Sequence, residues 1–155
     1  MLLGLIETGV RADLYQEIES LQIEYPPVSI TVLDRYYADF EYTSLISASD
    51  VVCIPYTNFI GSSNVMMHAA AQGRLVLAPE FGVLGELTRR YKLGVTCDTS
   101  DPKLVTEAIF KSVDAARRIC DKERQSIISF ATRYAVSLEQ FGVRVCDVLL
   151  EMAAR

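Results

Sequence analysis

The sequence contains no tryptophan and a single histidine, His68, among its 155 residues. Its four cysteines are widely spaced and form no Cys-x-x-Cys pair. Histidines and paired cysteines are the usual zinc ligands, and a disulfide framework needs a dense set of cysteines. The composition therefore predicts neither a metal site nor a disulfide scaffold, and it indicates a reduced, cytoplasmic protein.

Long apolar runs and runs of basic residues are also missing. The apolar segment at residues 2–6 is too short for a signal sequence, and nothing approaches the roughly 18 apolar residues of a transmembrane helix. The chain has 15 basic and 20 acidic residues, a net charge of -5, and no row of Lys or Arg that could follow a phosphate backbone. We therefore expect no transmembrane segment and no nucleic-acid binding.

Apolar residues are abundant and make up half of the chain. A chain of this length and hydrophobicity can bury a core as one ordinary domain. The sequence shows no internal repeat, low-complexity tract or linker. We therefore expect residues 1–155 to form a single domain.

Segments typical of strands and of helices alternate along the chain. Short apolar or β-branched runs predict strands, and apolar residues at helical spacing predict helices. The predicted strands cover residues 2–6, 28–33, 51–54, 75–78 and 94–97, and the predicted helices cover 8–24, 39–47, 62–72 and 84–91. From Asp101-Pro102, an N-cap and first-turn pair, the rest reads as helical, with breaks near Cys120 and Tyr134.

This alternation predicts an α/β fold: a doubly wound, Rossmann-like parallel sheet of five strands with a helical C-terminal tail from about residue 102. Strands that alternate with helices form a parallel sheet covered on both faces through right-handed crossovers. Ligands of such sheets bind beyond the carboxyl ends of the strands, where loops lead into helix N-termini. We therefore expect the functional site in the loops that follow the strands.

One of these loops has the composition of a phosphate site. It reads IPYTNFIGSSN from residue 54, and it enters the next helix through Gly61, Ser62, Ser63 and Asn64. Glycine lets a ligand approach the backbone, serines supply hydroxyls and N-caps, and first-turn N–H groups favour negative charge. The same four residues also make an ordinary helix cap, so the sequence leaves both interpretations open.

Three segments in this part of the chain carry a family resemblance. They read SASDVVCIPY, HAAAQGRLVLAPEFG and GELTRRYKLGVTCDTSDPKLVTEAI, in that order. Together they resemble the carboxyl-terminal, donor-binding half of glycosyltransferases with the GT-B fold, in particular the large retaining family that uses nucleotide-sugar donors. The resemblance is close over residues 50–109 and looser on both sides.

The resemblance implies a nucleotide-diphosphate sugar as donor substrate and no cofactor. It places the donor at the turn 61–64 and implies three further contacts. His68 would bond a ribose hydroxyl, Tyr36 would stack on the base, and Glu86 would meet a donor hydroxyl at a helix start. Each has a structural alternative: a half-buried helical histidine, a tyrosine that covers the core, and a carboxylate that caps a first turn.

Two departures from the family pattern concern catalysis. The family has glutamates at the positions held here by Ile60 and His68, and isoleucine accepts no hydrogen bond from a sugar. The family's first strand and helix carry Arg and Lys that neutralise the donor diphosphate, and no counterpart precedes Leu2. The acceptor site of the family lies on a separate amino-terminal domain, so we expect that domain to be missing from this chain.

The sequence thus predicts the donor-binding part of a glycosyltransferase that transfers a hexosyl group to an acceptor glycan, lipid or small molecule. It identifies no catalytic residue, and the isolated chain is expected to be inactive. The alternative is a non-catalytic interaction module that retains the GT-B half fold. A sugar-nucleotide hydrolase or epimerase would need an acid and a base in one cleft, which a single histidine makes a weaker hypothesis.

Overall fold

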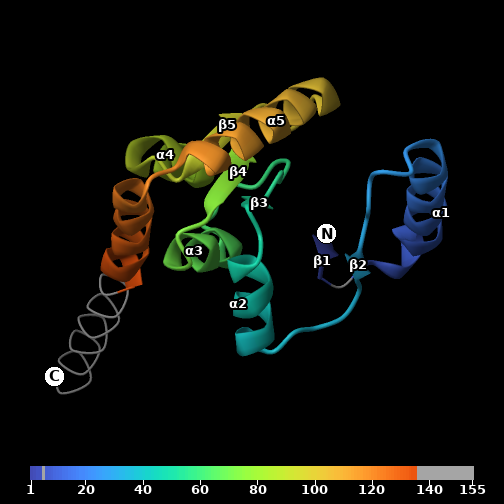
Figure 1. The fold of residues 1–155 in the computed structure, drawn as a ribbon, viewed down its shortest axis with the longest axis horizontal. Helices are drawn as coiled ribbons and strands as arrows, with labels where there is room; N and C mark the ends of the chain where they lie inside the picture. The colour runs from blue at the N-terminus through green and yellow to red at the C-terminus, as the bar shows by residue number, and fades with distance from the viewer. Residues whose placement is uncertain (5, 136–155) are drawn as a thin grey trace, which may run out of the picture. The chain divides into compact units, whose positions relative to one another are not determined.

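The computed structural model describes residues 1–4 and 6–135 of the chain (Figure 1). Their contacts divide the chain into two compact units, Met1–Tyr42 and a second unit that begins at Thr43. The single domain expected from chain length stays a prediction. Cys146 and the end of the predicted helical tail lie outside the described residues.

The first unit contains a two-stranded parallel sheet and one long helix. Its elements are β1 (Leu2–Leu3), α1 (Thr8–Glu24) and β2 (Val32–Leu33), and α2 (Asp39–Ser47) spans the boundary between the units. Asp34 follows β2 and accepts a hydrogen bond from the Ile6 N–H at 2.8 Å. Its other carboxylate oxygen lies 3.0 Å from Arg11 Nε of α1. This carboxylate therefore holds the start of α1 against the end of β2.

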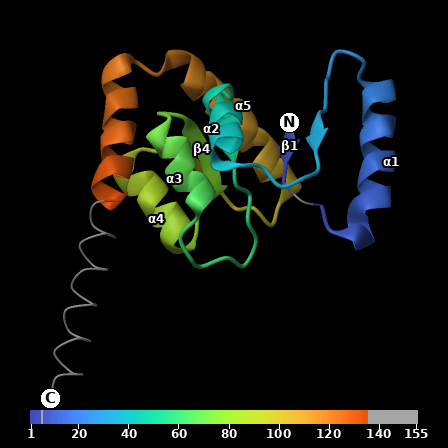
Figure 2. The ribbon, with the colours of Figure 1, turned by 90° about the horizontal axis from the view of Figure 1, so that it is seen from below.

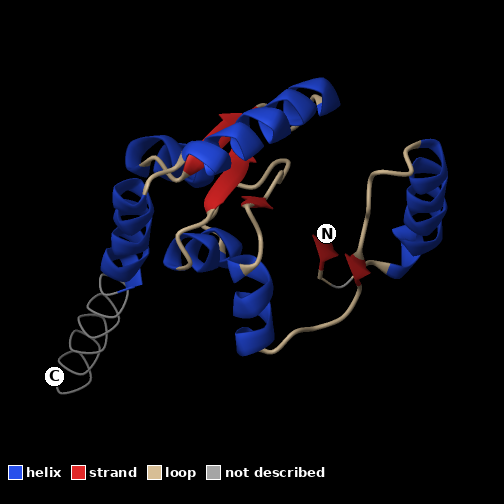
Figure 3. Ribbon diagram, in the orientation of Figure 1, coloured by secondary structure: helices blue, strands red, loops and turns tan. Residues whose placement is uncertain are grey.

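The second unit holds a three-stranded parallel sheet in the order β3-β4-β5. Its elements are β3 (Val51–Cys53), α3 (Asn64–Ala71), β4 (Leu75–Pro79), α4 (Gly82–Tyr91), β5 (Gly94–Cys97) and α5 (Pro102–Arg118), followed by a helix over 121–135. In register, Val52 lies opposite Val76, and Ala78 lies opposite Thr96. Figures 1 and 2 show α3 and α5 on opposite sides of this sheet, and Figure 3 distinguishes its strands from the helices around them.

The core of the second unit is built around β4, the central strand. All five residues of β4 are buried, as expected for a strand covered on both faces of a parallel sheet. Leu77 of β4 packs with Cys97 of β5 and Ala108 of α5, and partly buried valines surround this cluster. The helix α5 contacts all three strands, while α3 packs on β4 and α4 packs on β4 and β5.

Two glycines allow the close turns and contacts of this sheet. Gly73 has φ 62° and ends α3, with its N–H donating to the Ala70 carbonyl at 2.9 Å. A glycine in the left-handed conformation is a common way to end a helix, and Gly73 lies directly after the predicted helix over 62–72. Gly94 has φ 158°, and a Cβ atom there would lie 1.9 Å from the Val76 carbonyl oxygen. Only glycine lets β5 approach β4 this closely.

The predicted α/β class and the parallel direction of the strands are confirmed, but the expected sheet of five strands is not what the described residues form. Their strands divide into one sheet of two and one of three. The strand predicted over 28–33 is reduced to Val32–Leu33, and Val28 is exposed in the segment before it. A doubly wound sheet through both units stays a prediction.

The helical character predicted after residue 102 is confirmed up to residue 135. The predicted break near Cys120 is confirmed, because residues 119 and 120 separate α5 from the helix at 121–135. Tyr134 is still helical, and the chain beyond residue 135 is outside the described part. Within residues 1–4 and 6–135, no helix combines the length and the apolar composition needed to cross a membrane.

Candidate functional site

The loops that follow β3, β4 and β5 meet beyond the carboxyl ends of these strands. The Thr99 hydroxyl, after β5, donates a hydrogen bond of 2.7 Å to the Tyr56 carbonyl, after β3. A Cβ atom at Gly82, where α4 begins, would lie 3.4 Å from the Ile60 Cα atom. All three loops are therefore in contact at the edge of the sheet where parallel folds bind ligands.

The loop after β3 brings two aromatic rings together. The Tyr56 N–H donates to the Ile54 carbonyl at 2.7 Å, and Asn58 adopts the left-handed conformation with φ 56°. Asparagine tolerates this conformation better than most residues. The rings of Tyr56 and Phe59 then lie 5.1 Å apart at 71° to each other, an edge-to-face pair.

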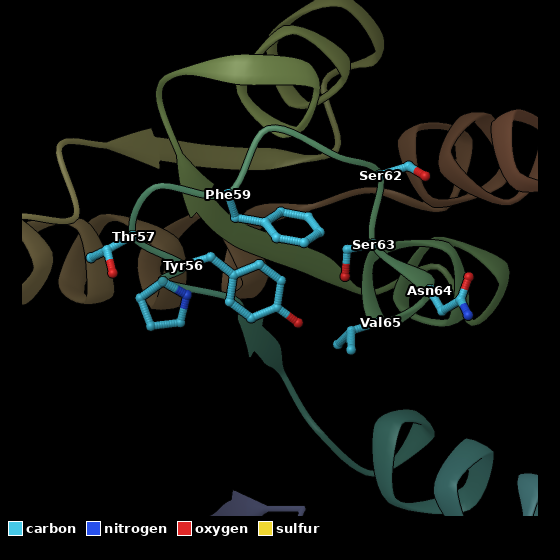
Figure 4. A pocket seen from close by; sticks show the side chains of 8 residues that line it. Tyr56, Thr57, Phe59, Ser62, Ser63, Asn64 and Val65 are labelled. Atoms are coloured by element: carbon cyan, nitrogen blue, oxygen red, sulfur yellow. The ribbon is translucent and has the colours of Figure 1, made fainter.

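A cleft of about 690 Å³ opens between this loop and the start of α3. It is lined by Pro55, Tyr56, Thr57, Phe59, Ser62, Ser63, Asn64 and Val65. Figure 4 shows that the Tyr56 and Phe59 rings and the Ser63 hydroxyl face one another, while the Ser62 and Asn64 side chains point away from the rings. None of these eight side chains is charged, so a charged ligand group would have to be compensated by backbone dipoles.

The positive potential of the cleft comes from the N-terminus of α3. Ser63 is the N-cap, is only 5% exposed, and accepts a hydrogen bond of 3.5 Å from the Met66 N–H. The N–H groups of Asn64 and Val65 have no partner within the helix, and they carry partial positive charge. The helix cap predicted from the sequence is confirmed at Ser63, and α3 begins at Asn64 rather than at Ser62.

Three of the residues predicted to bind the donor, Ser62, Ser63 and Asn64, line the cleft, and their contact with a donor stays a prediction. Gly61 is not among the lining residues. A Cβ atom at Gly61 would lie 3.3 Å from Phe59 Cζ, so this glycine leaves room for the aromatic ring. Its predicted contact with a phosphate stays a prediction.

The three other predicted contacts are not among the residues that line the cleft. His68 is half-buried in the last turn of α3. Glu86 is 63% exposed and lies 3.9 Å from Arg89. Because α4 already begins at Gly82, Glu86 is not at the helix start where the sequence places it. Tyr36 belongs to the first unit, where its side chain is 82% exposed.

Sequence reasoning missed the aromatic pair as part of the site. Tyr56 and Phe59 follow a strand directly and lie three positions apart, which is a detectable pattern. Their meeting depends on the left-handed turn at Asn58, and a left-handed asparagine is not obvious in a sequence. The sequence pattern alone therefore does not predict that the two rings meet, because their positions depend on the conformation of the loop.

Charged groups near this edge hold the loops in place. Arg89 Nη1 donates to the Glu80 carbonyl at 2.6 Å and so ties α4 to the end of β4. Asp98, after β5, accepts hydrogen bonds from the Ser100 hydroxyl at 2.6 Å and the Ser100 N–H at 2.9 Å. These two bonds lower the pKa of the Asp98 carboxyl below its ordinary value. The turn is therefore fixed by an ionised carboxylate at neutral pH.

Neither the side chains of the described residues nor the comparisons with known proteins identify a metal site or a family. The described residues contain no group of three or more His, Cys, Asp or Glu side chains that could hold a metal ion. Comparison with protein-family models and with curated protein sequences gives no match for this chain. The resemblance to GT-B glycosyltransferases accordingly stays an interpretation of the sequence pattern.

Proposed function

We propose that the cleft binds a nucleotide sugar and that the chain is the donor-binding part of a glycosyltransferase acting on a glycan, lipid or small-molecule acceptor. The observation that carries this proposal is the cleft itself. It lies at the carboxyl edge of a parallel sheet, opens at the N-terminus of α3, and contains an aromatic pair. The sequence pattern of residues 50–109 supports the same class of ligand.

The parts of the cleft correspond to the parts of such a ligand. The N–H groups at the start of α3 suit a diphosphate, because they are unpaired within the helix and carry partial positive charge. The rings of Tyr56 and Phe59 offer apolar faces to a base or a sugar ring. The neutral lining leaves the diphosphate charge compensated only by backbone groups, so we expect weak binding.

Sugar transfer needs more than this cleft provides. Breaking the bond between sugar and diphosphate develops negative charge on the leaving group, which cationic side chains normally stabilise. The eight residues that line the cleft include no Lys, Arg or His. We therefore propose that catalysis needs groups from another domain, and that this chain alone transfers no sugar.

The test is a titration of labelled protein with UDP, GDP, ADP and UDP-glucose, followed by amide chemical shifts. The amides of residues 61–65 are expected to move first. Phe59→Ala is expected to weaken binding about tenfold, since stacking on one aromatic ring contributes about 1–3 kcal/mol. Phe110→Ala is the matched control, because Phe110 is an exposed ring on α5 that does not line the cleft.

Two results would contradict the proposal. One is that none of the four nucleotides moves these amides at millimolar concentration. The other is equal affinity of Phe59→Ala and Phe110→Ala for the nucleotide that binds. Turnover of UDP-glucose by the chain alone would be compatible with nucleotide binding in the cleft. It would refute the proposal that catalysis needs another domain.

A non-catalytic interaction module is the second candidate function. Ile60 is 77% exposed at the position where the family resemblance places a sugar-binding carboxylate. Phe81, in the adjacent loop after β4, and Val83, in the first turn of α4, are also exposed. Exposed apolar side chains that gather on neighbouring loops suit a protein partner better than a sugar. If none of the nucleotides binds in the titration, an interaction module becomes the favoured function.

A further inference from the structure

A second cavity lies at the opposite edge of the three-stranded sheet. Its volume is about 740 Å³, and it includes Leu75 and Gly94, the first residues of β4 and β5. The cleft described above instead follows the last residues of β3. Because the strands are parallel, the cleft and the second cavity are at opposite ends of the sheet. A ligand bound in one of them does not occupy the other.

The lining of this amino-edge cavity has an apolar part and a cationic part. The apolar side chains are Leu75, Tyr91, Ala115, Ile119 and Ile127. The charged side chains are Lys92, Arg118 and Lys122, with the single carboxylate of Glu123. Three cations and one carboxylate give the amino-edge cavity an excess of positive charge, although the chain as a whole has a net charge of -5.

The one carboxylate already has a structural role. Glu123 Oε2 accepts a hydrogen bond of 3.0 Å from the Cys120 N–H, and so caps the helix at 121–135. This bond lowers the pKa of Glu123 below its ordinary value. The carboxylate thus caps the helix, and the nearby charge of Lys92 also lowers its pKa. The cations of the lining still outnumber this one carboxylate.

The walls of the amino-edge cavity are fixed by contacts that involve no ligand. Arg124 Nη1 donates to the Gly73 carbonyl at 2.9 Å and holds the helix at 121–135 to the segment that precedes β4. The Tyr91 and Phe130 rings lie 4.5 Å apart and join the end of α4 to the same helix. The cavity is therefore formed before a ligand binds.

We propose that the amino-edge cavity binds a small, free amphipathic anion, such as a phosphate monoester with a short alkyl or aryl group. The apolar body would lie on Tyr91, Ala115 and Ile119, which line the cavity and are partly exposed. The charged group would lie among Lys92, Arg118 and Lys122. Arg118 is 78% exposed and its guanidinium lies 4.0 Å from the Asp114 carboxylate, which places this cation at the rim with part of its charge already compensated. Exposed charges contribute little each, so the apolar contact supplies most of the affinity.

The experiment compares hexyl phosphate with inorganic phosphate and with hexanol, using amide shifts of labelled full-length chain. Each methylene group that leaves water strengthens binding about fourfold, so hexyl phosphate is expected to bind at least about tenfold more tightly than inorganic phosphate. Hexanol, which lacks the charge, is expected to bind more weakly than hexyl phosphate. The shifts are expected at Gly94, Ile119 and Lys122, and not at residues 61–65.

Charge variants test the role of the cations. Lys92→Gln and Lys122→Gln are each expected to weaken hexyl phosphate binding about two- to fivefold, the range for an exposed charge pair. Lys103→Gln is the matched control, because Lys103 is exposed on α5 and does not line the cavity. Ala115→Leu fills the cavity and is expected to abolish binding. If Ala115→Leu perturbs the fold, the two lysine variants and their control are sufficient to test the proposal.

The proposal is overturned when hexyl phosphate binds no more tightly than inorganic phosphate, or when both lysine variants bind as well as Lys103→Gln. Vesicles of phosphatidylglycerol distinguish a free ligand from a lipid headgroup. The chain is expected to stay in the supernatant when they are sedimented, because its net negative charge is repelled by an anionic surface. Co-sedimentation that the lysine variants reduce would refute the free-ligand assignment.

Discussion

Ser62 and Ser63 are adjacent serines with different surroundings. Ser63 is buried and its hydroxyl accepts from the Met66 N–H, whereas Ser62 is exposed and its side chain points away from the aromatic pair (Figure 4). An N-cap hydroxyl satisfies a backbone donor that the helix leaves unpaired. The first of the two serines thus contributes little to stability, and the second sets where α3 begins.

Replacement of these serines by alanine is expected to separate the two roles. Ser63→Ala should lower the free energy of unfolding by about 1 kcal/mol, the usual cost of a lost N-cap. Ser62→Ala should change it by less than about 0.5 kcal/mol, as for most exposed positions. Urea unfolding of both variants measures the difference, and equal losses would show that Ser63 is not the functional cap.

The bounds of α1, α2 and the three strands β3, β4 and β5 are predicted within one residue, those of α3 and α4 within two, and those of β1 and β2 least well. The predicted bounds of α1 and α2 agree with the structure, because local features such as the proline pair at 26–27 end a helix. Strand length depends on a partner that is distant in sequence, so β1 and β2 are shorter than their apolar runs. The edge of the sheet that holds the cleft follows from the fold, while the aromatic lining depends on one loop conformation.

The contact between β4 and β5 requires glycine at position 94, and no local sequence pattern predicts this requirement. A Cβ atom at Gly94 would meet backbone atoms of Val76, which cannot move without disrupting the central strand. Gly94→Ala is therefore expected to lower the free energy of unfolding by about 3 kcal/mol or more. Thermal or urea unfolding measures this loss.

Gly61→Ala is the matched control for the contact at Gly94. The nearest atom to its Cβ position belongs to the partly exposed Phe59 ring, which can rotate away. A loss below about 1 kcal/mol is expected for this variant. If Gly94→Ala were as stable as Gly61→Ala, the inference that β5 approaches β4 too closely for a Cβ atom at position 94 would be wrong.

At the scale of the whole molecule, both proposed sites and the main core belong to the second unit. The cleft, the amino-edge cavity and the cluster around Leu77 all involve residues after Thr43. The first unit has a sheet of two strands with two residues each, and Ile18 is the one buried residue of α1. A sheet of two short strands is marginal in water by itself.

A fragment of residues 39–155, which keeps α2 intact, is therefore expected to fold without the first unit. Ile46 and Ser47 of α2 belong with the second unit, since Ile46 is buried and the Ser47 hydroxyl bonds Gln72 Oε1 at 2.8 Å. Amide spectra of the fragment should overlay those of the full chain for β3, β4, β5 and the cleft, and its urea unfolding should be cooperative. A fragment of residues 1–42 should show the narrow amide dispersion of an unfolded chain. An unfolded 39–155 fragment would contradict this division, because the three-stranded sheet would then need the first unit for its stability.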